Sequence, residues 1–192
     1  GTYAPAPVLT DALRDEAMKN ILEPMVAAME KEGMPYVGCL YAGLMITDEG
    51  PKVVEFNARF GDPETQVVLP LLDSDLGEIM MACAKGTLTS NMVKWKDSSA
   101  ACVILASKGY PETSSKGDVI SGDIKQYDTT IVFHSGTKLV GENYVTNGGR
   151  VLGVVGLGKD LRTALDRAYG RIEHIDFEGM QYRTDIGAKA FK

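Results

Sequence analysis

One stretch, residues 52–66 (KVVEFNARFGDPETQ), constrains the fold of this chain more than any other. Its first half is rich in β-forming residues, which predicts a strand whose successive side chains point to opposite faces. On that two-residue period Glu55, Asn57 and Arg59 share one face of the strand. The strand is expected to end at residues 61–63 (Gly-Asp-Pro), because these are turn-forming residues.

A carboxylate and an amide on one face of a strand predict a metal site. Glu55 and Asn57 would be about 6–7 Å apart along the strand, and oxygen ligands are those that Mg²⁺ prefers. Arg59 would bring a fixed positive charge to that face, and Asp62 and Glu64 would add two carboxylates in the following loop. The competing interpretation is a solvated strand edge, whose ion pairs contribute under about 1 kcal/mol.

The motif Glu55-x-Asn57-x-Arg59 resembles the last metal-binding strand of the ATP-grasp ligases. Its extension to Glu64 (RFGDPE) resembles one family among them, the glycinamide ribonucleotide synthetases. Four further segments resemble that family in the same order along the chain: 3–7 (YAPAP), 40–44 (LYAGL), 108–111 (KGYP) and 147–152 (NGGRVL). The resemblance covers essentially the whole chain but begins part-way through the ATP-grasp domain. It therefore implies a C-terminal portion whose partner is the missing N-terminal half of the same enzyme.

The resemblance implies an α+β fold with two parts. Residues 1–90 would be the C-terminal part of an ATP-grasp domain, an antiparallel sheet with helices. Residues 91–192 would be a small β-rich C-terminal domain. Composition agrees with a boundary in this region, since residues 88–99 are polar and turn-rich.

Local patterns predict the individual elements. A helix is expected over 11–32, capped by Thr10 and kinked at Pro24, with an apolar stripe of Leu13, Ala17, Ile21, Met25 and Met29. An antiparallel hairpin is expected from a strand at 36–47 and the strand that begins at residue 52. The remaining predictions are helices at 64–72, 75–85 and 161–172, and strands at 100–107, 118–124, 130–135, 144–146 and 151–156.

The resemblance also implies a reaction, the ATP-dependent joining of glycine to 5-phosphoribosylamine through glycyl phosphate, giving glycinamide ribonucleotide. Glu55 and Asn57 would hold Mg²⁺ or Mn²⁺ against the phosphates of ATP. Arg59 would bind the nucleotide and steady the transferring phosphoryl group or the acyl phosphate. Asp62 and Glu64 would bind the ammonium of glycine or orient the attacking amine, so they join Arg59 as catalytic and substrate-binding candidates.

Two features qualify this expectation. Residues 41–45 contain no acid where many ATP-grasp enzymes have a further metal ligand, so water and substrate are expected to complete the metal's coordination.

Asn147-Gly148-Gly149 is the strongest hairpin-turn signal in the chain. Backbone N–H groups of such a turn beside an arginine can bind an anion. Gly148, Gly149 and Arg150 are therefore candidates for binding the substrate phosphate, against the alternative of a purely structural turn.

Composition excludes several classes of protein. A net charge of −6 and a pI near 5.0 argue against general binding to nucleic acid or to anionic membranes. No run approaches the roughly 18–20 apolar residues of a membrane span. The three cysteines show no C-x-x-C spacing, which favours a reducing cytoplasm. The open alternatives are another ATP-grasp carboxylate–amine ligase and a non-catalytic interaction module that retains the scaffold.

Overall fold

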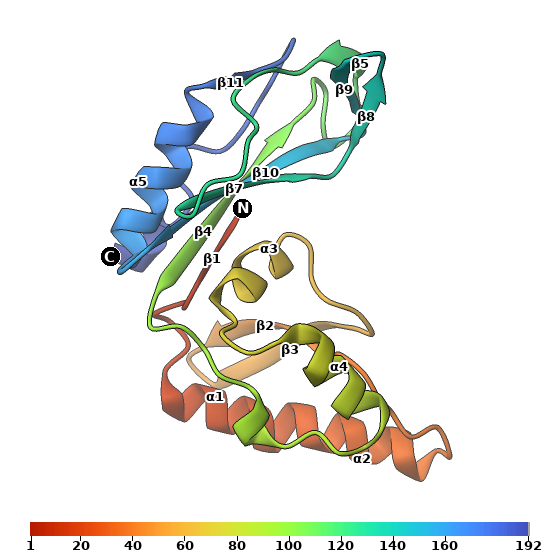
Figure 1. The fold of residues 1–192 in the computed structure, drawn as a ribbon. Coiled ribbons are helices and arrows are strands. Elements are labelled where there is room, and N and C mark those ends of the chain that lie inside the picture. The colour runs from red at the N-terminus through yellow and green to blue at the C-terminus, as the bar shows by residue number, and fades with distance from the viewer. Residues whose placement is uncertain (192) are drawn as a thin grey trace. The chain divides into compact units, whose positions relative to one another are not determined.

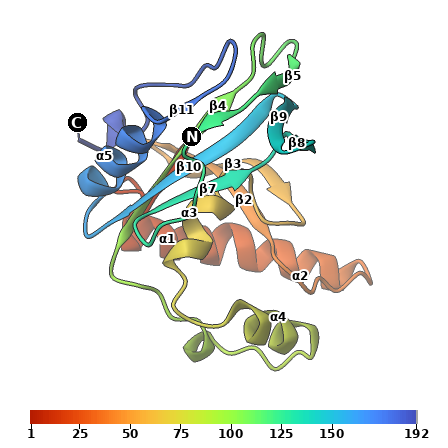
Figure 2. The ribbon, with the colours of Figure 1, turned by 45° about the horizontal axis from the view of Figure 1, so that its top comes forward.

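The computed structural model describes residues 1–191, which fold as two compact units (Figures 1 and 2). Unit 1 consists of Gly1–Pro5, Pro63–Leu71 and the chain from Lys96 onward. Unit 2 consists of Ala6–Asp62 and Leu72–Trp95. The two units therefore interleave along the chain, whereas the division into residues 1–90 and 91–192 is contiguous and stays a prediction about domains.

The helices and strands are bounded as follows. The helices are α1 (Asp11–Ala17), α2 (Glu23–Lys31), α3 (Thr65–Val68), α4 (Leu76–Ala84) and α5 (Leu161–Ile172), with a π-helical segment at Met18–Leu22 and 3₁₀ turns at Leu69–Leu71, Ser90–Met92 and Ala188–Phe191. The strands are β1 (Thr2–Ala4), β2 (Tyr41–Thr47), β3 (Gly50–Asn57), β4 (Ser99–Ala106), β5 (Lys116–Val119), β6 (Ser121–Gly122), β7 (Thr130–His134), β8 (Thr137–Val140), β9 (Asn143–Asn147), β10 (Arg150–Gly158) and β11 (Ile175–Asp176).

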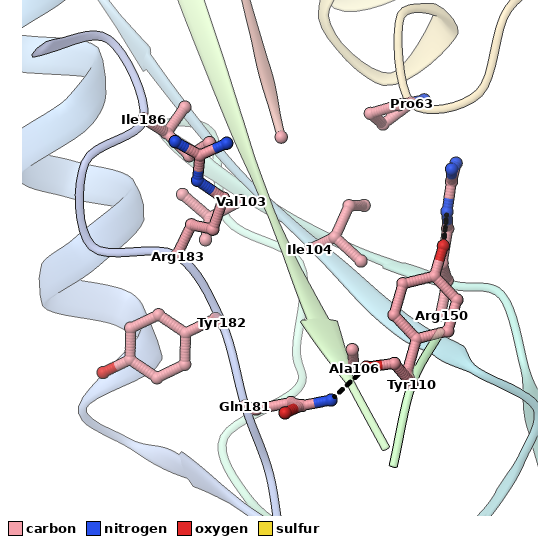
Figure 3. A pocket seen from close by; sticks show the side chains of 11 residues that line it. Pro63, Val103, Ile104, Ala106, Tyr110, Arg150, Gln181, Tyr182, Arg183 and Ile186 are labelled. Atoms are coloured by element: carbon pink, nitrogen blue, oxygen red, sulfur yellow. Dashed lines mark hydrogen bonds between the residues drawn. The ribbon is translucent and has the colours of Figure 1, made fainter. Parts of the chain in front are cut away.

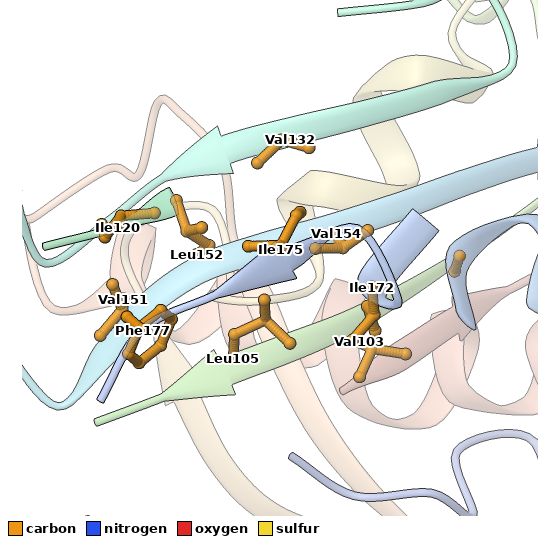
Figure 4. Packing of buried hydrophobic residues seen from close by; sticks show 11 residues of the cluster. Val103, Leu105, Ile120, Val132, Val151, Leu152, Val154, Ile172, Ile175 and Phe177 are labelled. Atoms are coloured by element: carbon orange, nitrogen blue, oxygen red, sulfur yellow. The ribbon is translucent and has the colours of Figure 1, made fainter. Parts of the chain in front are cut away.

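Unit 1 is built on a four-stranded antiparallel sheet with the order β1-β4-β10-β7. Alternate residues of β4 serve opposite faces, as the two-residue period of a strand requires. Val103 and Leu105 belong to the buried cluster that includes Ile172 of α5 (Figure 4). Cys102 instead packs with Val67 of α3. The central strands are therefore covered on both faces, by α5 and by α3.

Two small sheets complete unit 1. Strands β5, β9 and β8 form a three-stranded sheet in the order β5-β9-β8, and β6 pairs with β11. The chain passes directly from β9 into β10, so Gly148 and Gly149 connect the three-stranded sheet to the four-stranded one. This connection brings Arg150 to one end of the inner strand β10, of which it is the first residue.

Unit 2 pairs an antiparallel hairpin, β2–β3, with the long helical segment of α1 and α2. Thr10 caps α1, since its hydroxyl accepts a hydrogen bond from the backbone N–H of Leu13 at 3.3 Å. Of the five residues of the predicted apolar stripe, Ala17 is buried and the other four are half-buried. The helix expected over 11–32 is divided into α1, the π-helical segment and α2, and Pro24, where a kink is expected, lies in the first turn of α2.

Most of the other predicted elements are confirmed, and the structure differs from the prediction at several places. The first strand of the hairpin begins at Tyr41 rather than at residue 36, and the single strand expected at 118–124 is two short strands, β5 and β6, in different sheets. Strands β8 and β11 lie where no strand is predicted. Thr2–Ala4, for which no strand is predicted, pairs with β4 as the strand β1. No helix among residues 1–191 is long and apolar enough to cross a membrane.

Candidate functional site

The hairpin brings Glu55 and Asn57 together, as the alternation of the strand predicts. The Asn57 side-chain amide donates to a Glu55 carboxylate oxygen, Nδ2 to Oε1, at 2.8 Å. Gly43 lies directly opposite Glu55 on β2, and a Cβ added there would lie 3.1 Å from Glu55 Cγ. A glycine at this position therefore gives the Glu55 side chain room to lie over β2.

Strand β3 departs from simple alternation at both sides of this pair. Gly43 pairs with Glu55 and Leu44 with Val53, so Val54 is left out of the ladder as a bulge. The strand ends at Asn57 and a bend follows, so the expectation that Arg59 continues the strand face is wrong. The exposed Arg59 side chain instead donates from Nη1 to the Phe60 carbonyl at 3.0 Å.

The oxygens of Glu55 and Asn57 suit a hard cation such as Mg²⁺. They lie on neighbouring positions of one strand face, Glu55 is exposed and Asn57 is half-buried. Among the described residues, no three His, Cys, Asp or Glu side chains gather into a metal-binding group. Of the described residues, this pair alone is proposed as the ligand set, and the other coordination positions of a cation would be open to water and phosphate oxygens.

The turn that follows β3 divides its two acids between the units. The exposed Asp62 is the last residue of that part of unit 2, whereas the half-buried Glu64 belongs to unit 1. The Glu64 carbonyl accepts hydrogen bonds from the backbone N–H groups of Val67 and Val68, at 3.1 and 3.0 Å. Glu64 is thereby held at the start of α3, which packs on the main sheet of unit 1.

Unit 1 contains a cavity of about 350 Å³ beside Arg150 (Figure 3). That volume lies in the range of small-molecule sites. Strand β4 supplies apolar lining and the other walls carry polar side chains. The lining residues are Gly1, Pro63, Val103, Ile104, Ala106, Tyr110, Arg150, Gln181, Tyr182, Arg183 and Ile186.

Arg150 is half-buried and points into this cavity with a defined orientation. Its Nε donates to the hydroxyl of Tyr110 at 3.0 Å. Figure 3 shows the guanidinium extending beyond that hydroxyl towards Pro63. A second arginine of the wall, Arg183, makes a two-pronged contact with Asp185, from Nε at 2.8 Å and from Nη2 at 2.6 Å.

Gly148 and Gly149 do not form the hairpin turn that the sequence predicts. Neither glycine has a positive φ, whereas a two-residue type I′ hairpin turn requires a positive φ at both positions. An anion-binding nest alternates right-handed and left-handed backbone conformations, so the absence of a positive φ excludes that geometry as well. Gly149 is needed for space, because a Cβ there would lie 2.3 Å from the Tyr110 ring. A Cβ added at Gly148 would similarly lie only 3.1 Å from Gly136 Cα.

Tyr110 and Gln181 are among the residues of this cavity that sequence reasoning missed. Tyr110 lies in the KGYP segment that carries part of the resemblance, yet nothing local indicates its contact with Arg150, 40 residues away. Gln181 donates from Nε2 to the carbonyls of Ser107 and Tyr110, each at 3.0 Å. Only the folded chain brings these three segments together.

Comparison with known proteins bears on what these residues do. The chain is 51% identical to a phosphoribosylamine–glycine ligase of Caulobacter vibrioides, over 100% of this chain and 46% of that protein. The crystal structure of a Thermotoga maritima phosphoribosylamine–glycine ligase matches 96% of this chain and 45% of its own, at 33% identity and a TM-score of 0.83. A biotin carboxylase of Campylobacter jejuni shares the fold alone, at 14% identity and a TM-score of 0.67. The chain spans less than half the length of the ligases it matches.

Two family models match in the order expected of a C-terminal portion. The model of the phosphoribosylglycinamide synthetase ATP-grasp (A) domain matches residues 1–65, which include Glu55, Asn57, Arg59 and both loop acids. The model of the phosphoribosylglycinamide synthetase C domain matches residues 100–189, which include Arg150 and the cavity beside it. The two matches and the similarity along the whole chain lead to one conclusion: this chain belongs to the phosphoribosylglycinamide synthetase family.

Proposed function

We propose that this chain is the C-terminal portion of a ligase that joins glycine to 5-phosphoribosylamine at the expense of ATP. The glycine carboxylate attacks the γ-phosphorus of ATP, which forms glycyl phosphate and releases ADP. The amine of phosphoribosylamine then attacks the acyl carbon, releases phosphate, loses a proton and leaves glycinamide ribonucleotide. The observation that carries the proposal is the Glu55–Asn57 pair on β3, at the head of a motif that continues through Glu64.

Glu55 and Asn57 are the residues that would hold the divalent cation, Mg²⁺ or Mn²⁺. When bound, the cation neutralises charge on the phosphates of ATP. The hydrogen bond between the two side chains fixes them on one strand face, and Gly43 leaves the space that Glu55 occupies. Because the two side chains are already ordered, little further conformational entropy is lost when the cation and nucleotide bind.

Arg59 and the two loop acids are assigned to the groups that react. Charge builds on the oxygens of the transferring phosphoryl group, so a positioned arginine stabilises the transition state most. We assign this role to Arg59. Its side chain is exposed and donates a hydrogen bond to the carbonyl of the neighbouring Phe60. Asp62 and Glu64 are assigned to the ammonium of glycine or to the attacking amine.

The cavity beside Arg150 is assigned to the phosphate of the ribosyl substrate. An arginine provides a planar pair of N–H donors that matches phosphate oxygens, and the β4 residues of the lining suit the apolar edge of a sugar. Gly148 and Gly149 stay candidates for binding this phosphate through their backbone N–H groups, although their conformation is not that of an anion nest. A cytoplasmic location agrees with three free cysteines.

Steady-state kinetics of the full-length ligase test these assignments. Arg59→Lys is expected to lower kcat and kcat/KM together, because lysine cannot reproduce a two-pronged contact made in the transition state. Arg150→Ala is expected to raise KM for phosphoribosylamine and leave KM for glycine near normal. Arg14→Ala is the matched control, since Arg14 only forms exposed ion pairs with Asp11 and Asp15.

The isolated chain provides a second test. It is expected to show no ligase activity and to bind Mg·ATP more weakly than about millimolar, because the resemblance begins part-way through the ATP-grasp domain and the rest of the nucleotide site would belong to the N-terminal half. Titration calorimetry with Mg·ATP measures this directly. Micromolar affinity, or an Arg150→Ala enzyme with an unchanged KM for phosphoribosylamine, would contradict the corresponding assignment.

A further inference from the structure

Tyr110 contacts the segment around Arg150 in two ways. Its hydroxyl accepts the hydrogen bond from Arg150 Nε at 3.0 Å. Its ring lies against Gly149, where a Cβ would come within 2.3 Å of Cδ2 and 2.8 Å of Cε2. Any larger residue at position 149 would push the ring away, so this glycine allows the ring and the arginine to meet.

The loop that carries Tyr110 is anchored to the main sheet. Gln181 donates to the carbonyls of Ser107 and Tyr110, and its own backbone exchanges two hydrogen bonds with Ala106 at the end of β4, at 2.8 and 3.0 Å. At the other end of the loop, Asp118 accepts hydrogen bonds from Ser115 and Thr146, which lower the pKa of its carboxyl. The position of the Tyr110 hydroxyl is therefore set by the sheet.

We propose that Tyr110 is a positioning residue that orients Arg150 towards the phosphate of the ribosyl substrate, an inference that rests on the proposed function. An unrestrained arginine loses considerable side-chain entropy when it binds a ligand. A hydroxyl that accepts from Nε fixes the plane of the guanidinium and is itself neutral, so it does not cancel the arginine's charge. The terminal Nη groups extend past the hydroxyl on the Pro63 side of the cavity (Figure 3).

The test removes only the hydroxyl, with Tyr110→Phe in the full-length ligase. KM for phosphoribosylamine is expected to rise about tenfold, on the scale of one hydrogen bond to a charged group, while kcat and KM for glycine and for ATP stay unchanged. Tyr127→Phe is the matched control, because the Tyr127 hydroxyl donates to Asp123 at 2.9 Å, in the same unit and outside the cavity. The control should leave every constant unchanged.

A double-variant cycle separates positioning from direct contact. If Tyr110 acts through Arg150, Tyr110→Phe should cause no further rise of KM in an enzyme that already carries Arg150→Ala. Additive effects would mean that Tyr110 contacts the substrate itself, and the positioning role would be overturned. Gln181→Met, which loosens the loop without touching the hydroxyl, should raise the same KM by a few-fold.

The outcomes also separate this inference from the proposed function. If Arg150→Ala raises KM for phosphoribosylamine and Tyr110→Phe does not, the phosphate site stands and the positioning role falls. If neither variant changes the KM for phosphoribosylamine, both the assignment of the cavity to the ribosyl phosphate and the positioning role of Tyr110 fail. The melting temperature of each variant shows whether the substitution disturbs the fold in general. Tyr110→Phe is expected to have the same melting temperature as the wild-type enzyme.

Discussion

The packing of α5 on the main sheet depends on a glycine in β10, and its replacement is a severe test of the fold. A Cβ added at Gly156 would lie 2.0 Å from the Ala164 carbonyl oxygen and 2.6 Å from the Ala168 backbone nitrogen. Ordinary C···O contacts are about 3.3–3.6 Å, so Gly156→Ala requires α5 or β10 to move by more than about 1 Å. The obstructing atoms belong to a helix backbone, which cannot rotate away as a side chain can.

We expect Gly156→Ala to lower the free energy of unfolding by about 3 kcal/mol, the upper part of the range for overpacked cores. Ala164 and Ala168 are fully buried in the two clusters that join α5 to the sheet, so the displacement also loosens their contacts. Urea unfolding followed by far-UV circular dichroism measures the change. For a chain of this length the melting temperature should fall by roughly 6–12 °C.

A glycine within α5 provides the matched control. Gly170 is exposed, and a Cβ there would meet no atom within 4 Å. Gly170→Ala should therefore stabilise the chain by about 1 kcal/mol, the difference in helix propensity between the two residues. If Gly156→Ala unfolded at the same urea concentration as the wild type, the close packing of α5 against β10 would be incorrect.

Three further outcomes are expected. In the full-length ligase, Glu55→Gln and Asn57→Ala should each weaken the dependence on Mg²⁺ and lower kcat by on the order of 10²-fold, and wild-type turnover in both would refute the metal assignment. Gly149→Ala should displace the Tyr110 ring and raise KM for phosphoribosylamine about as much as Tyr110→Phe does, and an unchanged KM would count against the ring contact. A hydrogen bond from Arg171 lowers the pKa of Asp123 to about 2, so its stabilising effect is complete above the usual pKa near 4 and is lost as the pH falls towards 2. Asp123→Asn should flatten that part of the pH–stability curve in urea unfolding, and a curve that kept the wild-type slope between pH 4 and pH 2 would contradict the Arg171 contact.

The sequence by itself determined the features that depend on neighbouring residues. The periodicity of residues 161–172 predicts α5 with both of its ends. In the structure Asp160 caps this helix by accepting from the backbone N–H of Thr163 at 2.8 Å. The alternation around Glu55 and Asn57 likewise places these two side chains on one face, where they form a hydrogen bond. Caps and strand periodicity act within a few residues, so they can be read without knowledge of the rest of the fold.

Only the tertiary structure decided which distant segments meet. The short strand Thr2–Ala4 has no periodicity to identify it and is stabilised by pairing with β4, about a hundred residues later. The Gly-Gly signal after Asn147 predicts a hairpin turn, yet in the structure both glycines lie in close packing, against Tyr110 and Gly136.

The cavity beside Arg150 is also formed by segments that lie far apart in the sequence. Its polar wall combines β10 with the loop after β4 and the segment around Gln181, which contact one another across 40 to 74 residues. Such contacts depend on how strands pair and helices pack across the whole unit, and no local pattern of residues encodes them.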